Sequence, residues 1–259
     1  MARSVFYYHL SCEKLPDKHS SLRDRVVSIY NEHKGRYGYR RITMQLRNEG
    51  IVVNHKTVEK LMKQSGIKSL VRIKKYRSYR GQAGKIAPNV LQRDFAASAP
   101  NQKWATDVTE FNICGVKQYL SPVIDLYNGE IISYTLSLHP NLLMVTDMIN
   151  KVIKRAKDNN PILHSDQGWH YQNYSYQKIL KDNSITQSMS RKGNCLDNAV
   201  IENFFGILKS EFLYLQKFSS INQFQKELKE YIRYYNNDRI KAKLKGMSPV
   251  KYRTHSSKI

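Results

Sequence analysis

The chain has 259 residues, of which 41% are hydrophobic and 25% are charged, as in ordinary globular proteins. Its formal net charge of +22 at pH 7 predicts a polyanionic partner. No stretch approaches the ~18 apolar residues of a membrane-spanning helix, and the first residues lack the apolar core of a signal peptide, so we expect no membrane partner and a cytoplasmic, nucleoid-associated protein that binds nucleic acid.

The first third of the chain carries most of the positive charge, with 20 Lys and Arg against six Asp and Glu in residues 1–92. Apolar residues at helical spacing predict three helices there, at residues 21–34, 40–48 and 55–64. We expect Gly50 to end the second helix and Asn54 to cap the third. The outer face of the third helix carries Lys56, Lys60 and Lys63. This pattern favours a helix-turn-helix that contacts the DNA major groove, and a small helical bundle with a solvated face is the alternative.

Residues 67–98 are predicted to form a basic linker. The stretch 66–85 contains no acid and interleaves its basic residues with Tyr76 and Tyr79. We expect it to contact DNA phosphates while the tyrosines stack on exposed bases; a plain solvated linker is the alternative. The candidate DNA-binding residues of this stretch are Arg72, Lys74, Lys75 and Arg77.

Beyond Pro100 the pattern changes to that of a mixed α/β domain. Three antiparallel strands are expected at residues 103–111, 118–127 and 130–138, because β-branched and aromatic runs are separated by the turn signals Cys114–Gly115 and Asn128–Gly129. Later strands are expected at residues 161–164 and 185–189, and helices at residues 141–157, 174–182, 197–215 and 221–236. A sheet covered by helices on both faces accommodates this order. The predicted domains are residues 1–66, 67–98, 99–216 and 217–259.

Three carboxylates and one lysine stand out as candidate catalytic residues. Asp107 is predicted inside the first strand, where an isolated charge is unfavourable unless it is paired or binds a metal ion. Asp166 follows the short apolar run at residues 161–164, at a strand end of the kind where ligands bind in α/β sheets. Glu202 lies on a predicted helix, with Lys209 two turns further along the same side. The alternatives are a core ion pair for Asp107, a simple turn for Asp166 and a solvated helix face for Glu202.

Oxygen ligands are what Mg²⁺ or Mn²⁺ prefers, and three carboxylates carry enough charge to hold two such ions beside a DNA phosphate. Two ions ~3.5–4 Å apart activate the attacking oxygen and stabilise the leaving oxygen of a phosphodiester. Lys209 is placed to pair with a phosphate near the scissile bond. The residues alone therefore indicate a metal-dependent enzyme acting on nucleic acid.

The motifs around these residues resemble the second-frame (orfB) product of insertion-sequence-three-type bacterial transposases, in the D,D-35-E integrase superfamily. Thirty-five residues separate Asp166 from Glu202. The matching stretches are residues 164–171 (HSDQGWHY), 190–209 (SRKGNCLDNAVIENFFGILK), 37–42 (YGYRRI), 104–107 (WATD), 234–239 (YYNNDR) and 248–250 (SPV). The resemblance implies an RNase H-like catalytic core, with a mixed five-stranded sheet flanked by helices, preceded by a small all-helical helix-turn-helix domain. The zinc module of retroviral integrases is missing, which argues against that branch.

The resemblance also implies roles and partners. Asp107, Asp166 and Glu202 are then ligands of two Mg²⁺ (or Mn²⁺) ions, and Lys209 is a lysine of the catalytic core. The DNA partners are double-stranded element ends and target, bound by a homo-oligomer, and members often act as a fusion with an upstream orfA product. The basic loop residues Arg191 and Lys192 are expected to grip distorted DNA ends, with an ordinary basic turn as the alternative.

Two other functions remain open from the sequence. One is a metal-dependent nuclease of the same fold without strand transfer, which has no need of the end-recognition module. The other is a DNA-binding regulator or inhibitor derived from a transposase without independent catalysis, although all three acids and Lys209 are intact. The sequence therefore favours a transposase that cleaves and joins DNA strands.

Overall fold

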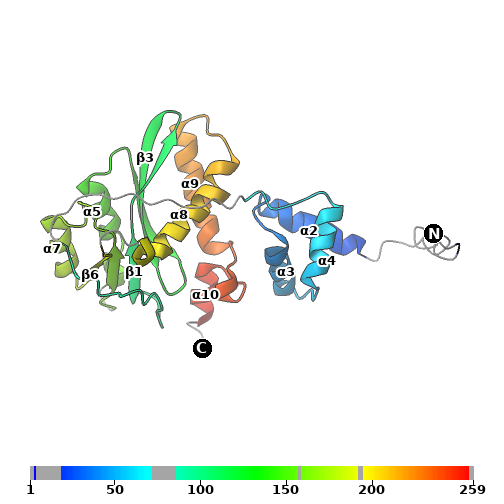
Figure 1. The fold of residues 1–259 in the computed structure, drawn as a ribbon, viewed down its shortest axis with the longest axis horizontal. Helices are drawn as coiled ribbons and strands as arrows, with labels where there is room; N and C mark the ends of the chain where they lie inside the picture. Colours follow the sequence, from blue (N-terminus) through cyan, green and yellow to red (C-terminus); the bar gives the residue numbers. More distant parts are fainter. Residues whose placement is uncertain (1–2, 4–18, 72–85, 157–158, 192–194, 257–259) are drawn as a thin grey trace. The chain divides into compact units, whose positions relative to one another are not determined.

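The computed structural model describes residues 3, 19–71, 86–156, 159–191 and 195–256 (Figure 1). It divides into two compact units, Met1–Leu70 and Val71–Ile259, which are considered separately. Within the described ranges no helix has the length and apolar character needed to cross a membrane. Several predicted DNA-binding residues lie outside the described residues: Arg72, Lys74, Lys75, Arg77 and Lys192.

The first unit is a three-helix bundle, as its apolar spacing predicts. Its helices are α2 (Ser20–Glu32), α3 (Tyr39–Asn48) and α4 (His55–Gln64). Side chains from all three helices fill one core, including Ile29, Leu46 and Leu61. The Asn54 side chain accepts a hydrogen bond from the Lys56 backbone N–H at 2.9 Å and so caps α4. Gly50 has a φ of +82° just beyond α3, which confirms the predicted end of that helix. The predicted start of α4 is confirmed by the Asn54 cap.

This unit extends slightly beyond the predicted boundary at residue 66. Leu70 donates its backbone N–H to the Gly35 carbonyl at 3.0 Å, and the Tyr30 hydroxyl donates to the Lys68 carbonyl at 2.9 Å. A Cβ on Gly35 would meet the Leu70 side chain at 2.7 Å, so the glycine makes room for this return of the chain. Residues 67–70 therefore pack against the helices of the first unit.

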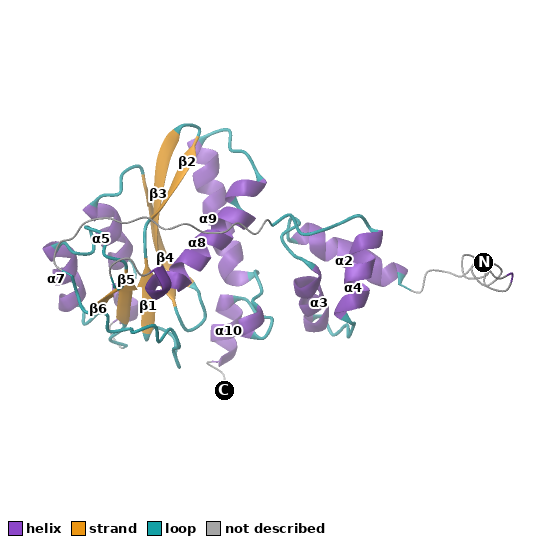
Figure 2. Ribbon diagram, in the orientation of Figure 1, coloured by secondary structure: helices purple, strands orange, loops and turns teal. Residues whose placement is uncertain are grey.

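The second unit contains a six-stranded mixed sheet with helices on both sides (Figure 2). The strands are β1 (Lys103–Thr106), β2 (Thr109–Ile113), β3 (Val116–Asp125), β4 (Ile131–Ser137), β5 (Ile162–Ser165) and β6 (Thr186–Met189). The strand order is β2-β3-β1-β5-β6, and β4 also pairs with β3. The three pairs that involve β3 are antiparallel, whereas β1–β5 and β5–β6 are parallel. The predicted turns are present, with positive φ at Cys114, Gly115 and Gly129.

The first predicted strand is interrupted, so the prediction that Asp107 lies inside a strand is wrong. β1 ends at Thr106, β2 begins at Thr109, and both pair with β3 in one register, Thr106 with Val123 and Thr109 with Leu120. Continuing that register places Asp107 opposite Pro122, which has no N–H to donate to the ladder. Just beyond β1, the Val108 backbone N–H donates to the Asp107 carboxylate at 2.7 Å. The proline thus explains why five predicted strands become six and why Asp107 is released from the sheet.

Alternate residues of the sheet face two separate cores. Ala105 and Ile124 pack with α8 (Ala199–Glu211) and α9 (Ile221–Asn237), whereas Trp104 and Val123 pack with α5 (Leu142–Asn150) and α7 (Tyr174–Asp182). The period of two along each strand is what a sheet covered on both faces requires. The remaining helices are α6 (Ile153–Ala156), α10 (Pro249–Ser256) and the 3₁₀ turns Cys195–Asn198, Leu213–Leu215 and Ala242–Leu244. The single predicted helix at residues 141–157 is thus two helices.

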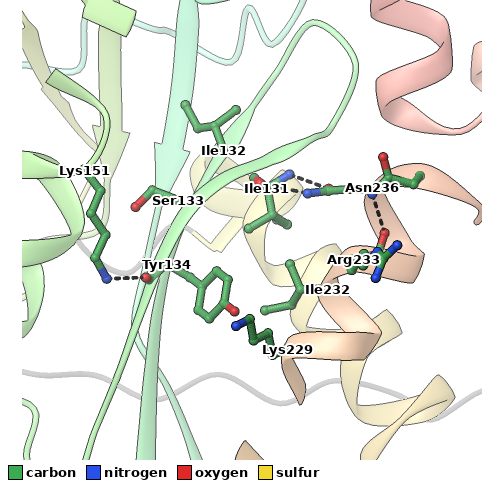
Figure 3. Close-up of a pocket in the computed structure, with 10 residues that line it drawn as sticks. Ile131, Ile132, Ser133, Tyr134, Lys151, Lys229, Ile232, Arg233 and Asn236 are labelled. Carbon is green, nitrogen blue, oxygen red and sulfur yellow. Dashed lines mark hydrogen bonds between the residues drawn. The ribbon is translucent and has the colours of Figure 1, made fainter. Parts of the chain in front are cut away.

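An open groove of about 620 Å³ lies between β4 and α9 (Figure 3). The Asn236 side-chain amide donates to the Ile131 carbonyl and accepts from the Ile131 N–H, both at 2.9 Å. It thereby replaces a neighbouring strand for that residue of β4. None of the three predicted catalytic carboxylates lines the groove.

Candidate active site

Two of the predicted carboxylates lie side by side at the carboxyl ends of adjacent parallel strands. β1 and β5 are paired in the register Ala105 with His164. Two residues further along each chain, this register brings Asp107 next to Asp166, just beyond both strand ends. The carboxyl ends of parallel strands are where α/β sheets collect ligands. Residues 59 positions apart in the sequence therefore form one acidic pair.

The environment of this pair disfavours negative charge. Burial raises the pKa of Asp107 well above its usual range, and the neighbouring Asp166 carboxylate and, to a smaller extent, Glu202 raise it further. Burial likewise raises the pKa of Asp166, against the opposing effect of the Gly168 N–H, which donates to its Oδ1 at 2.8 Å. Both side chains are only partly covered, so a ligand can reach them. Such a pair is stabilised when a cation binds between the carboxylates.

The turn after β5 is built closely around Asp166. A Cβ on Gly168 would lie 3.0 Å from both Asp166 Oδ1 and His170 Nε2, so a larger residue would displace one of them. The fully buried Tyr171 lies below the pair, and both carboxylates contribute to raising the pKa of its hydroxyl, after the larger effect of burial. Its hydroxyl is 3.5 Å from Thr106 Oγ1 at the end of β1. Tyr171 was missed as a candidate, although it lies within the matching stretch at residues 164–171.

Helix α8 brings the other two predicted residues to the same region. Ile201 and Phe205 of α8 are buried with Ala105 of β1, which fixes the helix on this face of the sheet. Glu202 is half-buried and close enough to affect the pKa of Asp107. Lys209 is also half-buried: burial lowers its pKa, while the negative charges of Asp107 and Glu110 oppose that shift. Glu202 and Lys209 of α8 thus both lie near enough to the Asp107–Asp166 pair for their charges to act on Asp107.

The donor set fits a hard divalent cation, because Asp107 and Asp166 offer carboxylate oxygens in a poorly solvated pair. Among the described residues no three His, Cys, Asp or Glu side chains converge closely enough to hold one ion together. Glu202 is therefore near the pair without joining it in a three-ligand cluster. His164 is not available as a ligand through Nδ1, which lies 2.9 Å from Ser188 Oγ in the core.

Comparison with known proteins assigns the chain to a family. Models described as "Integrase core domain" match residues 97–195 and 202–256, and a model described as "HTH-like domain" matches residues 18–75. The chain is 54% identical over 255 residues to InsK of insertion sequence element IS150 from Escherichia coli strain K12, covering 98% of this chain and 90% of that protein. It is 34% identical over 231 residues to the transposase InsF for insertion sequence IS3A of the same strain, covering 88% and 80%. The chain belongs to the IS3-type transposases.

A transposase-like protein of Haemophilus influenzae strain Rd is a third relative, 53% identical over 215 residues that cover 83% of this chain and 99% of that protein. The relatives and both integrase-core matches span the region that contains Asp107, Asp166, Glu202 and Lys209, although the two core matches leave residues 196–201 between them. The resemblance inferred from the motifs is thereby confirmed for this transposase, as is its mixed α/β fold.

Four of the predicted DNA-binding residues lie within the described part of the chain, and all four are on the surface. Lys56, Lys60 and Lys63 are exposed on α4, within the HTH-like region. Arg191 is exposed over 58% of its side chain, but its Nε and Nη2 already donate to Asp197 at 2.9 Å each. The structure therefore gives Arg191 a partner inside the protein that the sequence did not reveal.

Metal-free transposase should lose stability as the pH rises through the titration of Asp107 and Asp166. Their pKa values are raised in the folded state, so the folded protein binds more protons than the unfolded chain does. This proton binding stabilises the fold fully below the ordinary carboxyl pKa, and the stabilisation is lost as the pH rises toward the raised pKa values. In excess chelator, we expect Asp107→Asn to melt like wild type near pH 4 and above wild type at pH 8. Each 1 kcal/mol relieved raises Tm by roughly 2–4 °C in a domain of this size.

The measurement is a thermal melt at several pH values with Asp147→Asn as the matched control, because Asp147 is exposed on α5. In Asp107→Asn the new amide retains an oxygen that accepts from the Val108 N–H, so the local turn is preserved. A Tm difference between Asp107→Asn and wild type that is the same at pH 4 and pH 8 would contradict the prediction.

Proposed function

We propose that this IS3-type transposase is itself the catalyst that cuts and joins DNA strands of its insertion sequence, in a divalent-metal-dependent polynucleotidyl transfer. The observation that carries the proposal is the register of β1 and β5, which sets Asp107 beside Asp166 in a site that disfavours their charges. Glu202 and Lys209 on α8 complete a constellation suited to phosphodiester chemistry.

Asp107 and Asp166 are the residues proposed to hold the first divalent ion, with Glu202 contributing to the second. Mg²⁺ or Mn²⁺ bound there would supply Lewis-acid stabilisation of the attacking and leaving oxygens. Gly168 holds Asp166 in place through its N–H, and the Val108 N–H does the same for Asp107. The two carboxylates are thus oriented before any ligand binds, which reduces the cost of assembling the site.

Lys209 is proposed to bind a phosphate next to the scissile bond. Its ammonium is half-buried, and its Nζ lies 5.9 Å from the centre of the Phe111 ring. A partly desolvated cation interacts more strongly with a phosphate than a fully hydrated one does. The carboxylates would hold the ions, and Lys209 would hold the strand next to them.

DNA recognition is proposed to involve both units. Lys56, Lys60 and Lys63 of α4 bind the double-stranded element ends, and Arg191 contacts DNA near the active site. We extend the same role to the basic residues outside the described ranges, Arg72, Lys74, Lys75, Arg77 and Lys192. Assembly as a homo-oligomer on DNA, and action as a fusion with an upstream orfA product, belong to the same proposal.

The test is an assay of the purified full chain with labelled element-end DNA and with target DNA. With Mg²⁺ or Mn²⁺ we expect nicked ends and strand-transfer products, and with chelator neither product. Binding of the ends without any cleavage in either metal, by this chain and by its fusion with an orfA product alike, would overturn the proposal and favour a DNA-binding regulator. Cleavage without joining would instead identify a nuclease.

Lys60→Ala is expected to weaken binding of element ends with a smaller salt dependence than wild type. Removing one phosphate contact lowers the slope of log K against log salt by about 0.9 for duplex DNA. The measurement is end affinity at several salt concentrations, with Lys178→Ala on the exposed face of α7 as the matched control. An unchanged slope for Lys60→Ala would remove Lys60 from the proposed DNA interface.

A further inference from the structure

A buried carboxylate outside the acidic pair is surrounded by hydrogen-bond donors. Asp197 has a side-chain exposure of 0% and lies in the 3₁₀ turn Cys195–Asn198, directly before α8. Its Oδ1 accepts from Arg93 Nε at 2.7 Å and from Arg191 Nη2 at 2.9 Å. Its Oδ2 accepts from Asn89 Nδ2 at 3.1 Å, Arg191 Nε at 2.9 Å and the Arg191 backbone N–H at 3.1 Å. Five donors from three residues therefore converge on one carboxylate.

The donors come from two segments that are distant in the sequence. Arg191 follows β6, whereas Asn89 and Arg93 belong to the stretch 86–102 that precedes β1, called the entering stretch below. This entering stretch is itself attached to β6, because the Val90 and Leu91 N–H groups donate to Ser188 Oγ at 3.0 and 3.1 Å. The Asp197 cluster therefore ties the entering stretch, the end of β6 and the start of α8 to one another.

The same cluster reaches the strand that leads to Asp166. Ser188 Oγ is 2.9 Å from Nδ1 of His164, and His164 is two residues before Asp166 on β5. Gln167 Nε2 donates to the Ser190 carbonyl at 2.8 Å, which joins the turn after Asp166 to the residue before Arg191. The turn after Asp166 and the turn before α8 are thus linked by hydrogen bonds through Ser190 and Arg191.

We propose that Asp197, with Arg93 and Arg191, is a positioning cluster that holds the first turns of α8, and therefore Glu202, beside Asp107 and Asp166. The inference rests on the catalytic role proposed for Glu202. Because Asn89 and Arg93 lie on the entering stretch, the position of Glu202 depends on the contacts that hold that stretch against β6.

The charge and burial of Asp197 explain why this cluster can fix the position of the start of α8. The hydrogen bonds of Arg191, followed by those of Arg93, lower the pKa of Asp197 far below its usual range against the opposing effect of burial, so the carboxylate stays ionised. Loss of one arginine weakens the hold on this buried charge, while the remaining donors keep the carboxylate ionised. The other end of α8 is held separately, since Glu211 pairs with Arg239 at 2.7 Å. Changes at Asp197 should therefore affect the start of α8 more than its end.

Arg93→Gln is the main test, because Asp197 keeps its contacts with Arg191 and the fold should survive. Amide hydrogen exchange of the full-length protein without DNA or metal should become roughly tenfold faster at residues 203–206, reflecting a lost charge-assisted hydrogen bond, and stay unchanged at residues 209–211. Asp197→Asn should show the same local pattern with a larger change. Arg233→Gln is the matched control, since Arg233 is exposed on α9.

Strand cleavage adds a second readout. The maximal rate for Arg93→Gln at saturating DNA should fall, while the DNA concentration that gives half-maximal rate stays that of wild type. Unchanged exchange at residues 203–206, or an equal increase over the whole second unit, would overturn the positioning role. If wild-type protein proves inactive, the proposed function fails, yet the exchange pattern still decides whether Arg93 and Asp197 hold α8.

Discussion

Asp166→Asn should reduce strand cleavage and strand transfer by at least about a thousandfold, because metal stabilisation of the reacting oxygens contributes several kcal/mol and each 1.4 kcal/mol changes the rate tenfold. Asparagine retains the oxygen that accepts from the Gly168 N–H, so the turn after β5 should persist. What is removed is one of the two negative charges that make the pair attractive to a cation. Binding of element ends should therefore remain while product formation is lost.

The measurement compares cleavage rates at saturating Mg²⁺ and end affinities for wild type, Asp166→Asn and the matched control Asp182→Asn. Asp182 is exposed at the end of α7 and should behave as wild type. Metal-dependent stabilisation gives an independent check, since Mg²⁺ should raise the Tm of wild type more than that of Asp166→Asn. An Asp166→Asn protein that cleaves within tenfold of wild type would exclude Asp166 as a metal ligand.

Local sequence patterns predicted most of the elements but missed an interruption caused by a residue in another strand. Helices α4 and α7 have the bounds predicted for them, residues 55–64 and 174–182, because apolar spacing and the Asn54 cap of α4 are local signals. The break between β1 and β2 depends on Pro122 in β3, which is adjacent only after the strands pair. Register is a property of the folded sheet, so the sequence around Asp107 alone resembles one continuous strand.

The candidate site shows the same division between local and long-range information. Asp107, Asp166, Glu202 and Lys209 could be chosen because each lies in a motif whose spacing is visible in the sequence. The partners of Asp197 could not be chosen this way, since Arg93 lies 104 positions away and its contact depends on the path of the chain beside β6. The basic loop predicts a DNA contact for Arg191, but it carries no sign of the buried carboxylate to which Arg191 is also hydrogen-bonded.

The buried pair of Arg239 and Glu211 provides the largest expected effect on stability. Each side chain is 3% exposed, and two hydrogen bonds of 2.7 Å join the guanidinium to the carboxylate. Arg239→Met should lower the free energy of unfolding by roughly 3–5 kcal/mol, because it removes the guanidinium that balances the buried Glu211 charge. The measurement is denaturant unfolding of the full chain, with Arg233→Met on the exposed face of α9 as the matched control.

The double variant Glu211→Met, Arg239→Met separates the cost of an unpaired charge from the value of the pair. Replacing both members of a buried ion pair with apolar residues is often neutral or stabilising, so most of the loss should be recovered. The Tyr231 hydroxyl, which donates to Glu211 at 3.3 Å, loses its acceptor in that variant and limits the recovery. A double variant as unstable as Arg239→Met would show that the pair itself, rather than the stranded carboxylate, holds α8 against α9. In that case the end of α8 that follows Lys209 depends on a specific contact with the YYNNDR stretch, and Arg239→Met should also slow cleavage in the folded fraction.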